Sequence, residues 1–393
     1  MFLFMNLAFL TRFAETGEQR NSSRRKRPRF PPIILFLASS LITFSAFAQT
    51  EWLIFGDISA TKRDLPPKLA GEMKDQEINP SFTLFGNVDK QRYRLLFEGV
   101  IEDEAVDIER LQLGWKLNQM NTLWFGRFHN PVDYWTSKYQ HGLFFQTSQS
   151  RPGIVEFEDE GGMMPIHLSG FLFEGLYLTN GMAGISYTLT LAVGPRATTN
   201  RDGYTVLESP SVISPLEATY PHKPAISARL TYLPDAAGEQ EIGLFIGRNN
   251  ISTSDLSVVR SDVVQTSAGL FGNWENERYT VFGAAMFIRQ EMDMRINGND
   301  QEQAHLIRSQ YIQGEYSFLH SLSGYLRFED TQGIDDDAYI KSFSMFVKRR
   351  YVLGFRHEFS HHQAVKFEVS RAEHLHNSID FSSISLQWNM MFP

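Results

Sequence analysis

The sequence predicts an all-β fold, a transmembrane antiparallel β-barrel of about 16 strands. Three observations carry this prediction. Side chains alternate between apolar and polar along most of the chain. The connections between the alternating segments are short and long by turns, and an export signal precedes the first segment. Alternation with a period of two is typical of extended strands, and a strand needs only about 10 residues to cross a bilayer. A closed barrel can therefore span a membrane without a long apolar run.

An export signal occupies the N-terminal residues. A basic cluster at 24–29 precedes an uncharged apolar run that extends from Ile33 to Ala48 and ends in small residues. This order is typical of a secretory signal peptide, and we expect cleavage after Ala48. The run is shorter than the roughly 20 residues that a membrane-spanning helix needs. We therefore expect 1–48 to be an N-terminal leader with a cleaved signal peptide and 49–393 to be a single outer-membrane β-barrel domain.

The composition excludes several kinds of function. Acidic residues outnumber basic ones, 45 to 37, which opposes binding to nucleic acid because phosphates require patches of Lys and Arg. The chain has no cysteine, which excludes disulfides, thiolate nucleophiles and cysteine-ligated metal. We expect no cofactor, no metal ion and no nucleic-acid partner.

Sixteen segments show the period-two pattern. In "YRLLFEGVI", for example, Tyr93, Leu95 and Phe97 fall on one face, while Arg94 and Glu98 fall on the other. We expect strands near 51–59, 81–88, 92–101, 108–117, 121–128, 165–176, 183–193, 225–233, 241–248, 264–274, 278–288, 308–318, 321–329, 350–359, 364–371 and 379–392.

The connections between these segments alternate in length. "NQMN", "HS" and "SHHQ" are brief, whereas longer polar connections fall at 60–80, 129–164, 194–224, 249–263, 289–307, 330–349 and 372–378. Short periplasmic turns opposite long extracellular loops are typical of outer-membrane barrels, and an even strand count returns the C-terminus to the periplasm. Segment 338–347 also alternates, but a seventeenth strand would leave the C-terminus outside, so we interpret it as part of a loop. Aromatic residues beside the short turns would form a periplasmic girdle: Trp115, Tyr232, Trp274 and Tyr279.

The last predicted strand carries the most specific pattern. One face of "ISLQWNMMF" holds Ile384, Leu386, Trp388, Met390 and Phe392. A strand that alternates toward a final Phe resembles the assembly signal of Gram-negative outer-membrane proteins. "RYVLGFRHEFSHHQAVKFEVSR" with "SISLQWNMMFP" resembles the closing hairpins of the porin family, apart from the added Pro393. The resemblance implies an outer-membrane location, contact with outer-membrane lipid, insertion by the outer-membrane assembly machinery and a possible homotrimer.

A run of carboxylates lies within 126–170, after the fifth predicted strand: Glu156, Glu158, Asp159 and Glu160. In porins this connection folds into the barrel and narrows the pore, so the resemblance implies that 129–163 does so here. Inward positions on the predicted wall are mainly basic, and the candidate pore-wall cations are Arg94, Arg110, Lys116, Arg127, Arg229, Arg327, Arg356 and Lys366. We expect the acidic loop to oppose wall cations such as Arg94, Arg127 and Arg229, producing a transverse field. The basic wall favours anions and the acidic loop favours cations, and the sequence leaves this choice open.

These features favour a channel for passive diffusion of small hydrophilic or charged solutes. A non-conducting adhesin or structural barrel is the alternative, because the loops at 60–80 and 194–224 are long enough to bind partners. A barrel hydrolase is the third hypothesis, for which histidines are present at His129, His141, His167, His361 and His362. No recognisable serine nucleophile motif accompanies them, and we assign no catalytic residue.

Simpler interpretations of the charged residues also stay open. The acidic run would equally suit a solvated surface loop. An inward cation would equally pair with a neighbouring carboxylate, as Arg327 with Glu329, Arg356 with Glu358 and Lys366 with Glu368.

Overall fold

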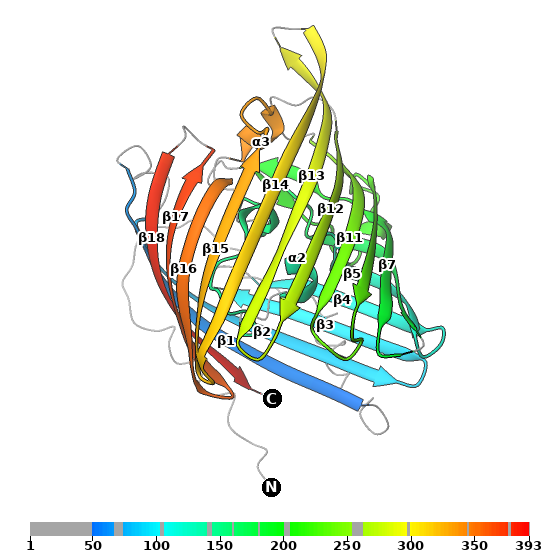
Figure 1. The fold of residues 1–393 in the computed structure, drawn as a ribbon. Coiled ribbons are helices and arrows are strands. Elements are labelled where there is room, and N and C mark those ends of the chain that lie inside the picture. The colour runs from blue at the N-terminus through cyan, green and yellow to red at the C-terminus, as the bar shows by residue number, and fades with distance from the viewer. Residues whose placement is uncertain are drawn as a thin grey trace, which may run out of the picture. The chain divides into compact units, whose positions relative to one another are not determined.

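The structure is a computed structural model that describes residues 49–66, 74–102, 106–139, 144–158, 161–179, 181–199, 205–253, 262–296, 299–343, 346–375 and 379–392. Within these residues, sixteen antiparallel strands close into a barrel, which confirms the predicted fold class (Figure 1). The barrel strands are β1 (Gln49–Arg63), β2 (Gln76–Lys90), β3 (Tyr93–Glu102), β4 (Val106–Lys116), β5 (Asn121–His129), β6 (His167–Leu178), β7 (Gly184–Val193), β10 (Pro224–Leu233), β11 (Glu241–Ile251), β12 (Val263–Glu275), β13 (Tyr279–Ile296), β14 (Asn299–Leu319), β15 (Leu322–Gln332), β16 (Val347–Ser360), β17 (Gln363–His374) and β18 (Ile379–Phe392).

The first and last strands close the barrel. Asp57 of β1 is paired with Asn389 of β18 on one side and with Ser81 of β2 on the other. Closure leaves no strand edge unpaired, which matters in hydrocarbon because each unpaired backbone group there costs several kcal/mol. The predicted closure between 51–59 and 379–392 is confirmed.

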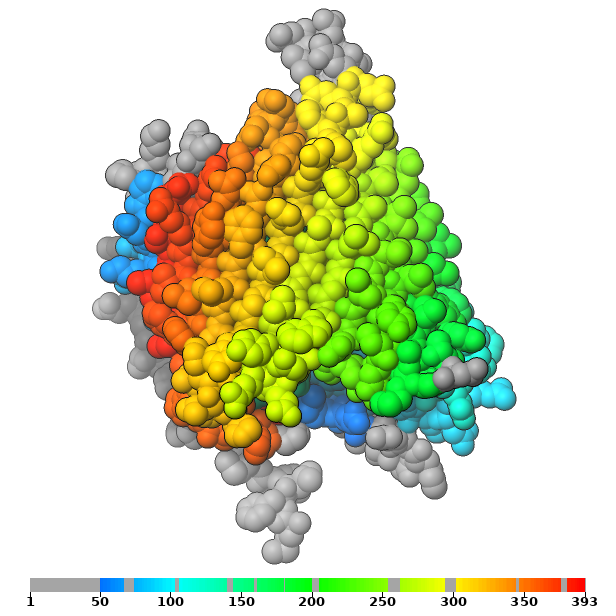
Figure 2. All heavy atoms as spheres, in the orientation of Figure 1, coloured from blue at the N-terminus to red at the C-terminus, as the bar shows by residue number. Residues whose placement is uncertain are grey.

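Side chains alternate between the two faces of the wall, as the sequence predicts. On β18, Leu386 is 52% exposed and its neighbour Gln387 is 3% exposed. By the same alternation of faces, Phe55 points inward and His357 points outward. On the face drawn in Figure 2, the outward side chains of neighbouring strands form a continuous surface. The four expected girdle residues are exposed: Trp115, Tyr232, Trp274 and Tyr279.

The β13–β14 hairpin is longer than the sequence predicts, and it projects beyond the neighbouring strands (Figure 1). Strand pairing continues to Ile296 and Asn299, through most of the segment 289–307 that was expected to be a loop. The outward residues Arg289, Glu291 and Asp293 are charged, so the apolar lipid-facing pattern ends at Phe287 while the strand continues. The predicted boundary therefore marks the end of the apolar band rather than the end of the strand.

The long connections contain structure of their own. Segment 338–347 holds the short helix α3 (Ala338–Ser342), which begins where the Asp337 carboxylate accepts a hydrogen bond from the Ile340 N–H (3.0 Å), so its interpretation as a loop is confirmed. The connection between β7 and β10 contains a separate hairpin, β8 (Arg196–Thr199) and β9 (Thr205–Glu208). In the described part of the chain, every helix is too short or too polar to cross a bilayer.

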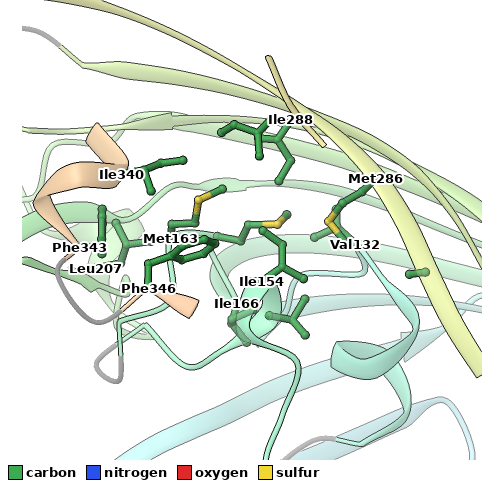
Figure 3. Close-up of a cluster of buried hydrophobic side chains, with 14 of the residues drawn as sticks. Val132, Ile154, Met163, Ile166, Leu207, Met286, Ile288, Ile340, Phe343 and Phe346 are labelled. Atoms are coloured by element: carbon green, nitrogen blue, oxygen red, sulfur yellow. The ribbon is translucent and has the colours of Figure 1, made fainter. Parts of the chain in front are cut away.

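An apolar core fills one side of the barrel interior. It joins the connection between β5 and β6 to the inward faces of β11 to β14 and to α3. Figure 3 shows its central side chains: Val132, Ile154, Met163 and Ile166 from the connection, Met286 and Ile288 from β13, Leu207 from β9, and Ile340, Phe343 and Phe346 from the segment around α3. Burial of one such side chain contributes about 1.5–3 kcal/mol, so this core holds the connection inside the barrel.

Candidate channel constriction

The connection between β5 and β6, which we call the constriction loop (130–166), enters the barrel at Asp133. The Asp133 carboxylate accepts hydrogen bonds from the Tyr311 hydroxyl of β14 (2.9 and 3.0 Å). It also accepts one from the Trp135 N–H (2.8 Å) at the start of the short helix α2 (Tyr134–Lys138). Arg229 of β10 donates to the Asp133 carbonyl oxygen (3.0 Å). Wall residues therefore fix the direction in which the loop enters.

Asp133 is held in an unfavourable environment. Its φ of +98° lies in a region that costs a non-glycine residue about 1–3 kcal/mol. Burial raises the pKa of the Asp133 carboxyl to about 6, against the opposing effects of the Tyr311 hydrogen bond and the Arg229 charge. The contacts with the wall must outweigh both costs.

Wall cations hold the next part of the constriction loop by its main chain. Arg356 of β16 donates to the carbonyl oxygens of Phe144 and Gln146, the latter at 2.8 Å. Lys366 of β17 donates to the Ser148 carbonyl oxygen (3.1 Å). Arg327 of β15 continues this row by donating to the carbonyl oxygens of Ser150 (2.8 Å) and Arg151 (3.3 Å). These three side chains thus replace the strand that an extended segment would otherwise pair with.

Wall carboxylates accept hydrogen bonds from the same segment. Glu368 of β17 accepts from the N–H groups of Gln149 (3.1 Å) and Ser150 (3.2 Å). Glu329 of β15 accepts from the Gly153 N–H (2.7 Å), where a 3₁₀ turn, η2 (Gly153–Val155), begins. Because buried backbone groups are costly unless they are hydrogen-bonded, this pairing allows the segment to lie inside the barrel.

A cavity of about 650 Å³ remains on the side formed by β1 to β3 and β16 to β18. Its inner boundary is the constriction loop between Gln149 and Gly161. Five carboxylates line it: Asp57, Glu77, Glu102, Glu156 and Glu368. Three arginines line it as well: Arg63, Arg151 and Arg350. The side facing β11 to β14 is filled by the apolar core, so the cavity lies against the opposite wall.

The structure separates the carboxylates of the acidic run. Glu156 lines the cavity and lies 3.9 Å from Arg350 of β16. Glu158 is buried instead, so the expectation that it faces a pore wall cation is wrong. Asp159 and Glu160 lie outside the described residues.

Glu158 is buried because the constriction loop returns to the wall at this point. It accepts hydrogen bonds from the N–H groups of Ile166 (2.8 Å) and His167 (3.1 Å) and contacts the His167 ring nitrogen Nδ1 at 2.7 Å. Nε2 of the same ring lies 2.8 Å from Glu109 of β4. These contacts pin the returning end of the loop to β6.

None of the eight candidate wall cations lines the cavity. Arg94 and Lys116 contact Asp89 (3.6 and 2.5 Å), and Arg110 contacts Glu98 (2.5 Å). These carboxylates lie on neighbouring strands, so the cations neutralise charge on the wall itself.

The other cations named as opposing the loop also have wall partners. Arg127 lies 3.6 Å from Glu109, and Arg229 lies 2.9 Å from Glu241. For the two described carboxylates of the acidic run, the nearest printed cation of Glu156 is Arg350, and Arg127 is linked to Glu158 only through Glu109 and His167. The prediction that Arg94, Arg127 and Arg229 oppose the whole run also concerns Asp159 and Glu160, which lie outside the described residues.

Arg327, Arg356 and Lys366 bind the main chain of the constriction loop, as do the carboxylates of Glu329 and Glu368. We call these five side chains the clamp. The expected pairs of Arg327 with Glu329 (2.8 Å) and of Arg356 with Glu358 (3.0 Å) are present as well.

Arg350 is the wall cation that the sequence analysis missed. It donates to Glu329 (2.8 Å) and to the Arg151 carbonyl oxygen while facing Glu156 across the cavity. Its position has the same parity as Arg356, so the alternation in "RRYVLGFRHEF" could have identified it.

The described histidines that the sequence analysis named lie in two separate places. The rings of His129 and His167 lie 4.8 Å apart, beside Glu109 and Glu158. His361 and His362 form an exposed turn between β16 and β17, and His141 lies outside the described residues. Within the described part of the chain, no group of three or more such side chains is arranged to hold a metal ion.

Comparisons with known proteins extend these findings. No family model and no curated protein matches the chain. Among solved structures, the anion-selective porin from Comamonas acidovorans superposes with a TM-score of 0.58 at 11% identity, covering 88% of this chain and 100% of that chain. The outer-membrane channel DcaP of Acinetobacter baumannii gives 0.54 at 11% identity, covering 88% and 98%. OmpF of Salmonella typhi, in a complex with daunomycin, gives 0.53 at 10% identity with the same coverage. The chain therefore has the closed 16-stranded barrel fold of Gram-negative outer-membrane porins.

Proposed function

We propose that this chain is a porin-like channel through which small hydrophilic or charged solutes diffuse passively across the Gram-negative outer membrane. The observation that carries the proposal is the cavity between the constriction loop and the wall of β1 to β3 and β16 to β18. Side chains such as Ser59, Thr83 and Ser383 give this cavity a polar lining that can replace part of the hydration shell of a solute.

The clamp on the constriction loop supports a fixed rather than a collapsible opening. Arg327 and Glu329 are both buried, and together they hold loop groups at Ser150 and Gly153. Breaking a buried charged contact of this kind costs about 3–5 kcal/mol, so thermal motion alone rarely displaces the segment. We therefore expect a steady conductance that is limited by the space between loop and wall.

The test combines single-channel recording with cysteine modification, which is clean because the chain has no cysteine. Ser383→Cys places a thiol on β18 in the cavity lining. We expect the purified barrel to conduct ions in a planar bilayer, and a bulky methanethiosulfonate reagent to reduce the conductance of this variant.

Ser267→Cys is the matched control, because Ser267 also points inward but is fully buried on β12, where the apolar core fills the barrel. We expect its conductance to be unaffected by the reagent. A folded barrel that does not conduct would contradict the proposal and favour a non-conducting adhesin or structural barrel. Conductance that is unchanged after confirmed labelling of Ser383→Cys would show that solutes take another path.

The same proposal includes the route to the membrane. We propose that residues 1–48 direct export and are removed, and that the assembly machinery recognises the terminal strand β18 and inserts the barrel among outer-membrane lipids. A homotrimer remains part of the proposal. It is supported by the fold similarity to the trimer form of OmpT from Vibrio cholerae, which superposes with a TM-score of 0.52 at 8% identity and covers 88% of this chain and 100% of that chain.

A further inference from the structure

We infer that the opening passes small cations in preference to anions, and that carboxylates on the wall of β1 and β17, together with Glu156, set this preference. The inference rests on the proposed channel function and adds the charge of the solute. It makes a choice that the sequence leaves open, between a basic wall that would favour anions and an acidic loop that would favour cations.

Two of the three arginines of the cavity are paired with carboxylates. Arg63 of β1 forms an ion pair with Glu77 of β2 (2.9 Å) at the end of the cavity nearest the connection between these strands. Arg350 lies between two carboxylates, Glu329 at 2.8 Å and Glu156 at 3.9 Å. The positive charges of Arg63 and Arg350 therefore attract a passing anion only weakly.

The third arginine is turned toward the constriction loop. Arg151 is only 4% exposed, donates to the Val155 carbonyl oxygen (3.0 Å) and stacks on Phe157, with 3.9 Å between the guanidinium carbon and the ring centre. Lys366, the lysine of the clamp, is completely buried beneath the loop and does not line the cavity. The most basic part of the barrel wall is thus covered by the loop that it holds.

Two carboxylates of the cavity are instead hydrogen-bonded by neutral donors. Asp57 of β1 accepts from the Ser81 hydroxyl (2.5 Å) and from the Gln387 amide (3.2 Å). Glu368 accepts from the Tyr325 hydroxyl (2.7 Å) as well as from the loop N–H groups. Neutral donors stabilise an ionised carboxylate without cancelling its charge. Cations of the wall also attract these carboxylates, Lys366 acting on both and Arg327 on Glu368, but neither of these two cations lines the cavity.

Position along the barrel separates Asp57 from the ion pair of Arg63 with Glu77. Asp57 precedes Arg63 by six residues on β1, which corresponds to about 20 Å along an extended strand. This distance exceeds the Debye length of about 8–10 Å at physiological salt, so Arg63 does little to offset Asp57. Because five carboxylates and three arginines line the cavity, its lining carries net negative charge, which raises the local concentration of cations.

The test is the reversal potential of the full barrel in a potassium chloride gradient. We expect the wild-type channel to favour potassium. We expect Asp57→Asn, which keeps an oxygen to accept the Ser81 hydrogen bond, to lower the potassium-to-chloride permeability ratio roughly two- to fivefold, as expected for removal of one charge in a hydrated pore. Glu156→Gln changes a loop residue and provides a second variant if Asp57→Asn fails to assemble.

Asp380→Asn is the matched control, because it removes a carboxylate from the exposed, outward side of β18. We expect its reversal potential to equal that of the wild type. A conducting wild-type channel that favours chloride would overturn the inference while leaving the channel proposal intact. A potassium preference that survives both Asp57→Asn and Glu156→Gln would overturn the assignment of these residues. A barrel that does not conduct would overturn the channel proposal itself.

Discussion

Arg327 shows how one side chain can connect the wall to the constriction loop. Its guanidinium group donates to Glu329, to Gln313 and to the loop at Ser148 and Ser150. We predict that Arg327→Met leaves Glu329 partly uncompensated, lowers the free energy of unfolding by about 3–5 kcal/mol and gives a larger and noisier conductance, because the loop is released locally. Single-channel recording and thermal unfolding in detergent would measure the two effects.

Arg110→Met is the control for this prediction, because Arg110 pairs with Glu98 on the wall and is not part of the clamp on the loop. We expect it to reduce stability without changing the conductance. Equal conductance in Arg327→Met and the wild type would contradict the role of the clamp.

Asp133 gives the loop anchor a dependence on pH. Because folding raises the pKa of this carboxyl to about 6 from 3.8, the folded protein binds a proton more readily, and the contribution of Asp133 to stability is greatest below about pH 4 and is lost as the pH rises through 6. A shift of about two units corresponds to about 3 kcal/mol. We predict that Asp133→Asn, which keeps an oxygen acceptor but cannot ionise, is more stable than the wild type at pH 8.

Thermal unfolding in detergent at pH 4 and pH 8 would measure this difference. At pH 4 we expect the variant and the wild type to unfold at similar temperatures, because the wild-type carboxyl is then largely protonated. A variant that is less stable than the wild type at pH 8 would contradict the explanation.

Alternation in the sequence predicts which way a side chain points but not what it meets. It correctly places Arg327, Arg356 and Lys366 on the inner face. The loop carbonyl oxygens that they bind are 176 to 218 residues away in the sequence, and every residue type provides such an oxygen. No pattern of side chains could therefore predict that these cations would bind the loop rather than line the pore. Glu158 was misplaced for a related reason, since its burial depends on the fold of the loop around it.

The terminal strand β18 is the element whose orientation the sequence predicts best. Leu386 is exposed on the outside and Gln387 faces the cavity beside Asp57. We predict that Leu386→Arg costs about 2–4 kcal/mol and reduces outer-membrane assembly, because it places a charge against lipid. Gln387→Arg should be tolerated, because its charge would point into the hydrated cavity. Membrane fractionation of the two variants would test this, and equal amounts of both in the outer membrane would contradict the assigned faces.

Elements outside the apolar band were predicted less well, because they do not contact lipid. The outer parts of β13 and β14 carry charged residues on their outward face, such as Arg289 and Glu291, so the lipid-facing pattern ends before the strands do. In 338–347, alternation suggested a strand, but Tyr339, Ile340 and Phe343 are buried in the interior core beside a capped helix. Apolar residues in a loop can therefore imitate a strand when the loop folds inward.

At the scale of the whole molecule, closure and an even number of strands could be predicted because they follow from the bilayer, and the number 16 came from counting the alternating segments. A barrel must close, and the turns must return the chain to the same side after each pair of strands. The position of the cavity could not be predicted in this way, since it depends on which wall the loop packs against.

The N-terminus allows a prediction for the whole mature protein. β1 begins at Gln49, directly after the expected cleavage site, and pairs with β18 from Ile54 onward. We predict that the protein isolated from outer membranes begins at Gln49, and that residues 49–393 refold in detergent without the leader. N-terminal sequencing and the shift of the heated barrel on a gel would test both statements. A mature protein that retains residues 1–48 would contradict the assignment of the leader.

The clamp has a consequence for how this channel could change over evolutionary time or be redesigned. Arg356 and Lys366 hold the carbonyl oxygens of Gln146 and Ser148, and these contacts do not depend on the identity of the side chains in this segment. Mutations in the segment can therefore alter its chemistry while the backbone keeps its course. The wall and the loop backbone stay the same while the side chains that line the cavity change. One such barrel could therefore give rise to channels that prefer different solutes without a change of fold.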